Sequence, residues 1–527
     1  MIIEGAGAEP DACHCDVIVV GAGAVGLLTA VELARSGRRV RVFEAGGNQL
    51  QPRAQRRVEQ AAVVGHPHPG LHLGRFCMLG GTTNFWGGQL LRFDRNIFSP
   101  RPWVHEDAGW PIDRRELDPF YDRALGLLGM AHHVADEATL FGRLGIEPPR
   151  LEDLAYFVTL KTPEPNLALY FEDELRALEN LVVHLQMPVR ALELDADGET
   201  VSGVRCRDAA GVDHVFTGDD VVLCNGTIEI VRLLAAPLAD GRPAPWSELP
   251  WLGRGFMDHV DCHAGNVFPR DRRRFHDLFD AILLKGIKYE PKLKIAEATQ
   301  ERERLLAASA FFIFNSSRAE HLANLRIFAR ALLRGRWQAG ALRPAEWLGV
   351  ARMAVPMMLR YLRYRRMYNP ADQGVKLRVS GEQRMLAESR LVFRDELDAL
   401  GNPIADLDWR IDGAEIDALA FVAERVRDLL EVAGLATVEL DRRLVARDPA
   451  FKDALEDTNH QMGMARMGAT AQHGVVDADL RVHRTRNLFV AGAAVFPSTG
   501  FANPTFTGVA LGLRLAARLQ RRLALAA

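Results

Sequence analysis

The sequence predicts an α/β fold with a parallel β-sheet at its centre, and three observations lead to this expectation. A short β-branched run at residues 16–20 is followed directly by a glycine-rich turn and a helical pattern. Another strand, small-residue loop and helix closes the chain over residues 487–519. The 527 residues also exceed the roughly 250–300 that a single core accommodates, so two domains are expected, with three possible.

The first of these elements is a short strand that runs into a glycine turn. Residues 16–20 (DVIVV) have the continuous apolar character of a buried parallel strand. Gly21, Gly23 and Gly26 follow at the spacing Gly-x-Gly-x-x-Gly. Gly21 permits the tight turn, Gly23 lets the backbone approach a pyrophosphate, and Gly26 lets the next helix pack closely on the strand.

The elements after the turn complete a dinucleotide-binding unit. Apolar residues at helical spacing run through 25–35, and a second strand at 39–44 ends in Glu44, 18 residues after Gly26. The helix N-terminus offers N–H groups to phosphates, and an acid at this distance would bond ribose hydroxyls. The unit therefore predicts a Rossmann-like dinucleotide site rather than a plain turn, but does not by itself distinguish NAD from FAD.

Composition excludes several other classes of function. With a formal net charge of −3, the chain has no overall field that would attract nucleic acid. No apolar run is long enough to span a membrane, and the first ten residues do not resemble a secretory signal. The six cysteines are scattered; Cys13-His14-Cys15 lacks a second ligand pair, so we expect no metal site and reduced thiols in a cytoplasmic protein.

The C-terminal part carries a series of short motifs at fixed order. Residues 460–468 read HQMGMARMG, and VVD, NLFV, FP and NPT follow at 475–477, 487–490, 496–497 and 503–505. These motifs resemble the signature of the glucose-methanol-choline (GMC) oxidoreductase family. Similar segments lie at 80–88, 109–112, 221–229 and 253–259, so the resemblance extends from about residue 16 to 517, with no match at about 270–375.

The resemblance implies FAD as the cofactor and assigns residues to its site. The residues that it places against FAD are Gly21, Gly23, Ala24, Gly26, Glu44, Ala45, Gly81, Thr82, Trp86, Gly87, Val189, Gly226, Gly492, Ala493, Pro504 and Thr505. Two departures from the family are visible. Gly492 stands where members commonly have Asp. Phe85 stands where some members carry a histidine bonded to the flavin, so we expect FAD to be held without a covalent bond.

The resemblance also implies a reaction, the oxidation of an alcohol with hydride transfer to flavin N5. The protein must supply a base, and histidine suits this role because its ordinary pKa lies close to neutral pH. His460 occupies the position of the base, and Asn503 the second position, which is His or Asn in the family. We expect structural roles for His259, His263 and His473. The spacing of the cysteines does not indicate an iron–sulfur cluster.

Several substrates and roles stay open on the sequence alone. Trp86 and the segment 109–111 resemble the sugar-oxidising branches near pyranose oxidase and bacterial sugar dehydrogenases, which favours a sugar or glycoside. A hydrophobic or lipid-linked alcohol, such as a sterol, is the second option. A flavin-carrying binding protein without turnover and a nicotinamide-dependent enzyme are the rivals. The electron acceptor is oxygen or another carrier.

The family pattern divides the chain into two discontinuous domains. Residues 1–95, 185–265 and 455–527 would form the FAD-binding domain. Residues 96–184 and 266–454 would form an α+β substrate domain with a mixed or antiparallel sheet and a basic helical insertion at about 270–375. Alternating apolar residues predict strands at 184–216 and a hairpin at 391–411, whose strands could form the floor of the substrate pocket.

One segment of the substrate domain has an unusual charge pattern. Residues 334–366 contain eight arginines and a single acid, Glu346, with tryptophans, methionines and tyrosines between them. A basic amphipathic helix can lie on a membrane surface or meet anionic groups. The alternative is a helical cover over the substrate entrance, with arginine stems packed on apolar surface. Peripheral membrane contact through 334–366 is thus one of two expectations.

Overall fold

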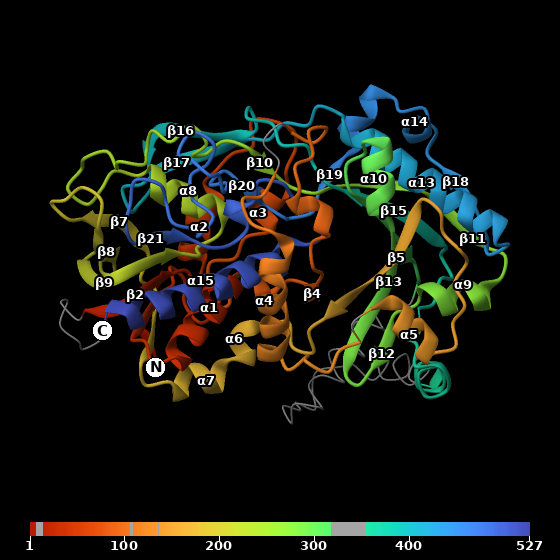
Figure 1. The fold of residues 1–527 in the computed structure, drawn as a ribbon, viewed down its shortest axis with the longest axis horizontal. Helices are drawn as coiled ribbons and strands as arrows, with labels where there is room; N and C mark the ends of the chain where they lie inside the picture. Colours follow the sequence, from red (N-terminus) through yellow and green to blue (C-terminus); the bar gives the residue numbers. More distant parts are fainter. Residues whose placement is uncertain (7–13, 106–108, 135, 318–354, 368, 527) are drawn as a thin grey trace.

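The computed structural model describes residues 1–6, 14–105, 109–134, 136–317, 355–367 and 369–526. The molecule is elongated, with one large sheet in each half (Figure 1). The α/β fold predicted from the sequence is confirmed, with a parallel sheet in one half and an antiparallel sheet in the other. The cavity described below lies where these two halves meet.

The first sheet has eight strands in the order β1-β6-β3-β2-β9-β8-β7, with β21 also paired to β9. Its strands are β1 (Ile2–Glu4), β2 (Cys15–Val20), β3 (Val40–Phe43), β6 (Leu181–Leu185), β7 (Val189–Leu194), β8 (Val201–Arg207), β9 (Asp213–Leu223) and β21 (Leu488–Val490). All pairs from β1 to β21 are parallel, and β7, β8 and the first part of β9 form an antiparallel extension. The predicted strands at 16–20, 39–44, 184–216 and 487–492 all form.

Two helices cover the parallel sheet close to the predicted glycine turn. Helix α1 (Ala24–Arg35) follows β2 directly, and α15 (Pro504–Ala526) packs against α1 and against α4 (Arg114–Leu127). The β-branched residues of β2 are almost wholly buried, as expected for a strand between two neighbours with helices above. In Figure 1, α1 from the start of the chain and α15 from its end lie side by side.

The second sheet has nine strands, and its pairs are antiparallel. Its main path is β18-β11-β15-β14-β13-β5-β4, with β12 and β19 attached. These strands are β4 (Gln89–Leu90), β5 (Leu154–Lys161), β11 (Val260–Pro269), β12 (Ile282–Leu284), β13 (Ile287–Ile295), β14 (Ala308–Phe314), β15 (Val375–Gly381), β18 (Ala436–Leu440) and β19 (Glu456–Asp457). Helix α13 (Glu415–Val432) packs across β14, β15 and β18 and covers one face.

Two further sheets of the described residues have two strands each. Strands β10 (Phe256–Met257) and β20 (Met462–Gly463) pair with each other, as do β16 (Arg390–Leu397) and β17 (Pro403–Asp408). The remaining described elements are α2 (Pro52–Glu59), α3 (Gly70–Leu73), η1 (Gly81–Asn84), η2 (Arg95–Phe98), α5 (Glu137–Arg143), α6 (Leu167–Tyr170), α7 (Glu172–Ala177), α8 (Thr227–Ala235), α9 (Arg272–Phe279), α10 (Glu297–Glu303), α14 (Arg442–Val445), η3 (Pro449–Ala454) and η4 (Ala493–Val495).

One expectation for the substrate domain needs correction. Of the expected basic helical insertion at about 270–375, residues 270–317 form the short helices α9 and α10 but also β12, β13 and β14 of the nine-stranded sheet, and the buried residues of β13 alternate as in a strand with one covered face. The hairpin at 391–411 forms as predicted; its strands pair with each other and make single bridges to Val63 and Arg254, and residues 398–402 at its turn help to line the cavity described below. Most of the arginine-rich segment lies outside the described residues; its end, 355–364, is helical.

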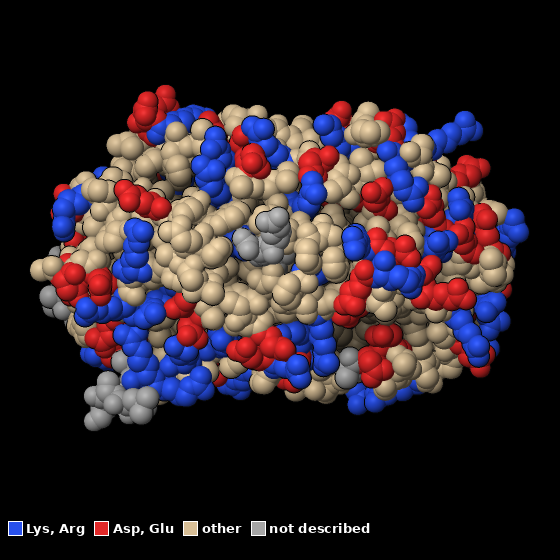
Figure 2. Space-filling model, turned by 45° about the horizontal axis from the view of Figure 1, so that its top comes forward, with Lys and Arg blue, Asp and Glu red and all other residues tan. Residues whose placement is uncertain are grey.

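The surface of the described chain carries charge of both signs. Figure 2 shows lysine and arginine side chains interspersed with aspartate and glutamate, and a broad uncharged area over the middle of this face. Within the described ranges, every helix is too short or too polar to span a bilayer.

Candidate active site

A cavity of about 640 Å³ opens where the carboxyl ends of β2, β3 and β9 meet. In open α/β sheets this edge is where ligands bind, since the helices that follow the strands point their N-termini toward it. The cavity wall is built from nine stretches of the chain. They are residues 20–25, 43–45, 57–58, 73–89, 188–189, 224–233, 398–402, 458–461 and 491–508 in part.

The three glycines of the N-terminal turn have the separate roles that the sequence predicts. Gly21 has a φ of +96°, and a Cβ there would lie 2.6 Å from the Cα of Asn225. A Cβ at Gly26 would collide with the carbonyl oxygen of Gly21. Gly23 is different, because a Cβ there would meet no protein atom within 4 Å, and its backbone lines the cavity. Gly21 and Gly26 therefore shape the turn, while Gly23 leaves it open to a ligand.

Glu44 follows β3 and is buried at the edge of the cavity. Its carboxylate accepts hydrogen bonds from the backbone N–H groups of Ala22 at 3.0 Å and Gly46 at 2.9 Å. Burial raises the pKa of Glu44, while these two N–H groups and the guanidinium of Arg57 favour its ionised form. Each carboxylate oxygen keeps acceptor capacity that a ribose hydroxyl could use.

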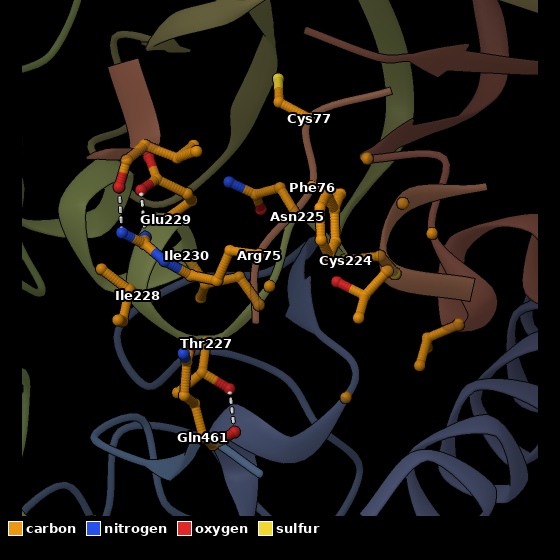
Figure 3. Close-up of a pocket in the computed structure, with 18 of the residues that line it drawn as sticks. Arg75, Phe76, Cys77, Cys224, Asn225, Thr227, Ile228, Glu229, Ile230 and Gln461 are labelled. Atoms are coloured by element: carbon orange, nitrogen blue, oxygen red, sulfur yellow. Dashed lines mark hydrogen bonds and ion pairs between the residues drawn. The ribbon is translucent and has the colours of Figure 1, made fainter. Parts of the chain in front are cut away.

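The loop before β4 supplies an aromatic wall. Trp86 lines the cavity, and its indole N–H donates to the carbonyl of Pro165 at 2.6 Å. Phe85 is 57% exposed and stacks on Phe76 with ring centroids 3.8 Å apart. Figure 3 shows Phe76 on the same chain segment as Arg75 and Cys77. Leu73 at the same wall is also exposed, so this rim is apolar.

Another part of the cavity wall is ionic, and no sequence pattern indicated it. Arg75 donates to Glu229 at 3.0 Å (Figure 3), and Arg232 joins Glu229 at 2.8 Å and Asp398 at 2.7 Å. Thr227, at the start of α8, donates to the carbonyl oxygen of Gln461 at 2.7 Å. These bonds fasten α8 and the turn of the β16–β17 hairpin to the cavity.

His460 and Asn503 meet at the cavity although 43 residues separate them. His460 lies just before β20, and Asn503 directly precedes α15. The amide Nδ2 of Asn503 is 2.7 Å from Nε2 of His460, and both side chains line the cavity. Nδ1 of His460 lies 2.6 Å from the hydroxyl of Thr458 and 3.0 Å from Nδ1 of His259.

The hydrogen bonds around His460 fix which ring nitrogen carries the proton. The hydroxyl of Thr458 lies 3.0 Å from the carboxylate of Asp258. Because an ionised carboxylate only accepts, Thr458 gives its proton to Asp258 and must accept from Nδ1 of His460. Nε2 of His460 is then the acceptor, which agrees with an amide N–H of Asn503 pointing at it.

The same direction of donation continues beyond Asn503. The carbonyl oxygen of Asn503 accepts from the amide of Gln89, and the carbonyl oxygen of Gln89 accepts from the ammonium of Lys292 at 3.0 Å. Lysine can only donate, as the carboxylate at the far end can only accept. We call the line Lys292, Gln89, Asn503, His460, Thr458 and Asp258 the donor chain. Because each member donates a hydrogen bond to the next, the chain sets the orientation of both amides and of the imidazole.

Burial and charge keep His460 in its neutral form. Burial lowers the pKa of His460, although Asp258 opposes this shift. Burial lowers the pKa of His259 to about 3, with His460 adding to the effect. Burial alone would raise the pKa of Asp258, but its bond to His68 and the nearby imidazoles lower it. A neutral His460 beside an ionised Asp258 is the arrangement that a general base needs.

The structure brings together nearly all of the residues that the sequence assigned to the site. Of those predicted for FAD, all but Gly26 line the cavity, and Gly26 acts through packing as described. Trp110, from the segment used to favour a sugar, is buried and packs against Phe93, Phe98 and Phe496. His259, expected to be structural, contacts His460.

Four residues of the donor chain were not predicted from the sequence: Asp258, Thr458, Gln89 and Lys292. Asp258 lies within the motif at 253–259 and Thr458 lies two residues before His460, so proximity in sequence offered a weak signal for both. Gln89 and Lys292 offered none, because only the antiparallel pairing of β4, β5 and β13 brings them beside Asn503.

Comparison with known proteins gives a consistent picture. Residues 387–512 match the GMC oxidoreductase family, and residues 16–57 match the FAD dependent oxidoreductase family. Paromamine 6'-oxidase of Streptomyces fradiae is 24% identical over 95% of this chain and 90% of its own length. The chain therefore carries the C-terminal region of GMC oxidoreductases at 387–512 and an FAD dependent oxidoreductase segment at 16–57.

Two other relatives match this chain over a shorter stretch. 6'''-hydroxyparomomycin C oxidase of Streptomyces lividus is 29% identical over 26% of this chain, and the fructose dehydrogenase large subunit of Gluconobacter japonicus is 31% identical over 27%. These matches span 23% and 24% of the relatives' lengths.

Solved structures share the fold. Pyridoxine 4-oxidase from Mesorbium loti has a TM-score of 0.55 at 18% identity, over 96% of this chain and 99% of that one. A fungal aryl-alcohol oxidase has a TM-score of 0.56 at 16% identity, over 97% and 99%.

The cofactor of this protein is FAD, and the cavity has features that fit FAD. Gly23 leaves the turn open to a pyrophosphate, and the N-cap of α1 makes no side-chain hydrogen bond that would occupy its N–H groups. Glu44 presents its carboxylate at the edge of the same cavity, where it could accept hydrogen bonds from ribose hydroxyls. Gly492, with a φ of +126° and a Cβ position 3.9 Å from the nearest side-chain atom, leaves a second open approach beside Ala493.

Proposed function

We propose that this protein oxidises the CH–OH group of a sugar or glycoside to a carbonyl, with His460 as the base. The observation that carries the proposal is the donor chain, which leaves the Nε2 lone pair of a neutral imidazole facing the cavity. A binding protein without turnover has no need for a base with a fixed tautomer. The bound FAD supplies a hydride acceptor.

The pair of side chains can hold a hydroxyl group in one orientation. A substrate oxygen placed between them would accept from Nδ2 of Asn503 and donate its proton to Nε2 of His460, replacing their present bond at 2.7 Å. Proton loss would leave a positive imidazolium, which the carboxylate of Asp258 stabilises through Thr458. Asn503 cannot compete for the proton, since its N–H groups only donate.

Support for a sugar comes from the relatives and from the polar wall. The three curated relatives are named for oxidation of paromamine, hydroxyparomomycin and fructose. Gln89, Asn503 and Thr82 bring amide and hydroxyl groups to the cavity, and Trp86 offers an aromatic surface beside them. Hydroxyl-rich substrates need such a mixture of donors, acceptors and a flat apolar face.

The apolar rim favours a second candidate, a hydrophobic alcohol. Leu73 is 72% exposed, and the stacked pair Phe76 and Phe85 lies next to it. A lipophilic substrate would cover these side chains as it entered. The two candidates differ in which alcohols reduce the flavin.

The test is anaerobic reduction of the bound flavin by a panel of sugars, glycosides and lipophilic alcohols. His460→Ala should keep its FAD and lose at least about two orders of magnitude in reduction rate, the share that a positioned base supplies. His473→Ala is the matched control, because His473 is exposed and bonds only locally to Thr470. Reduction of His460→Ala at the control's rate would remove His460 from the mechanism.

We propose further that FAD is held without a covalent bond, since Phe85 has no atom that could form one. Acid precipitation should release all yellow colour into the supernatant, and colour in the pellet would contradict this.

We also propose that residues 1–95, 185–265 and 455–527 form the FAD-binding domain and that the remainder forms the substrate domain. Strands β4 and β11 cross these limits, since both join the nine-stranded sheet.

A further inference from the structure

A row of side chains on the nine-stranded sheet adjoins the catalytic pair. Gln89 on β4 lies directly opposite Lys161 on β5, and Lys161 lies opposite Lys288 on β13. Residues directly opposite in an antiparallel pair project from the same face. Lys292, four residues along β13, alternates onto this face too. Since Gln89 lines the cavity and bonds Asn503, the lysines stand at the substrate side of the site.

The ammonium groups on this face share one carboxylate. Glu290 takes its shortest bond from Lys288, at 2.6 Å, and lies 3.1 Å from Lys161 and 3.9 Å from Lys292. The lysines lower the pKa of Glu290 to about 2 against the effect of its burial, so it is ionised. Even with Lys288 left aside, Lys161 and Lys292 set two ammonium groups against the one carboxylate of Glu290. Burial lowers the pKa of Lys292 to about 8, which still leaves it mostly charged at neutral pH, so this face keeps a net positive charge among the described residues.

Other charged groups nearby are balanced on their own. Lys294, the next lysine on this face, pairs with Asp94 at 2.5 Å. Arg378 pairs with Asp261 at 2.5 Å and with Glu456 at 2.6 Å. The surplus is therefore localised at Lys161 and Lys292, beside Gln89.

Both ammonium groups are placed to reach a ligand. Lys161 and Lys292 have side chains that are 26% and 15% exposed, so they are partly shielded from water but not sealed. The Nζ of Lys161 is 3.6 Å from the Cβ position of Gly87, which lines the cavity. Lys292 donates to Gln89, which lines the cavity, and its longer contact with Glu290, at 3.9 Å, leaves donor capacity for a ligand. In partly shielded surroundings such donors bind an anionic oxygen more strongly than a neutral one.

We propose that the alcohol substrate carries an anionic group, a carboxylate or a phosphate, which Lys161 and Lys292 bind while its hydroxyl lies between His460 and Asn503. The inference rests on the proposed oxidation of a CH–OH group and narrows its substrate class. A neutral sugar leaves the surplus charge unmatched, and an amino sugar is repelled by it.

The experiment compares matched substrates by anaerobic flavin reduction in the holoenzyme: a methyl hexoside, the corresponding hexuronoside, the 6-phosphate and the amino sugar. We expect kcat/KM for an anionic member to exceed the neutral one by about tenfold or more, the lower range for a hydrogen bond to a charged group. Whether the uronoside or the phosphate leads identifies the anion. A neutral or amino sugar as the best substrate overturns the inference and leaves the oxidation standing.

Two variants and one binding measurement complete the test. Lys161→Met should remove the anionic preference, whereas Lys294→Met should retain it, because Lys294 lies on the same face of the sheet but pairs with Asp94. Cyclohexanecarboxylate, which has no hydroxyl to oxidise, should perturb the flavin spectrum with a Kd about tenfold weaker in Lys161→Met. An equal Kd in both proteins overturns the inference whether or not any alcohol reduces the flavin.

Discussion

The hydroxyl of Thr458 offers a direct way to test how the tautomer of His460 is fixed. Thr458→Val keeps the volume of the side chain and removes only the acceptor for Nδ1 of His460 and the donor to Asp258. Asp258 would lose little, because backbone N–H groups of His259 and His460 and the ring of His68 still bond its oxygens. The imidazole would lose one of the two bonds that distinguish its nitrogens and keep the other, from Nδ2 of Asn503 to Nε2.

The size of the effect follows from that one bond. The contact between Nδ1 of His460 and the hydroxyl of Thr458 is 2.6 Å long and lies in a largely buried place. A hydrogen bond of this kind contributes about 0.5–1.5 kcal/mol, and 1.4 kcal/mol is about tenfold in rate. We expect the limiting rate of flavin reduction to fall roughly tenfold, well short of the loss in His460→Ala, since Asn503 still favours the reactive tautomer.

The assay is stopped-flow reduction of bound flavin under anaerobic conditions, with FAD content measured beside it. Thr458→Ser is the matched control, because it restores the hydroxyl and should reduce at nearly the wild-type rate. If Thr458→Val is as fast as Thr458→Ser at equal FAD content, the donor chain does not govern the base.

Three further outcomes are expected. Burial holds the pKa of His460 below its ordinary 6.5, so the neutral base persists above that pH. The rate of flavin reduction should therefore be constant above about pH 6.5 and fall at more acidic pH. A fall in rate centred above pH 6.5 would contradict this. Gly23→Ala should leave the Tm of the FAD-free protein unchanged but purify with little FAD, since the added Cβ occupies space open to the ligand and meets no protein atom within 4 Å; full flavin occupancy would refute this. Arg101→Met, which leaves buried Glu382 without its bidentate partner at 2.6 and 2.7 Å, should lower the free energy of unfolding by about 3–5 kcal/mol in urea, against about 1 or less for Arg302→Met at the surface.

Local sequence patterns predicted the cofactor half of the molecule well. The strand at 16–20, the helix at 25–35 and the acid at position 44 are consecutive, so their geometry depends on short-range propensities and glycine conformation. The same holds for the closing strand and helix. Motif order then placed His460 and Asn503 in one site, and the structure brings their side chains into contact.

The substrate half was predicted less well, for a physical reason. Residues 270–317 were expected to be helical and basic, yet they supply three strands, whose stability comes from pairing with β5, β14 and β15 rather than from local propensity. The hairpin at 391–411 was predicted correctly because its turn is local, but where it would pack was not local information.

By itself, the sequence determined a dinucleotide turn, its acid, and a base with an amide partner near the C-terminus. Only the tertiary structure decided how that base is oriented and what faces it. Gln89, Lys161, Lys292, Asp258 and Thr458 come from separate strands and loops, and antiparallel register and domain contact bring them around His460. Such long-range pairing produces no periodic pattern in the sequence, because each of these polar residues could equally lie on a solvent-exposed strand.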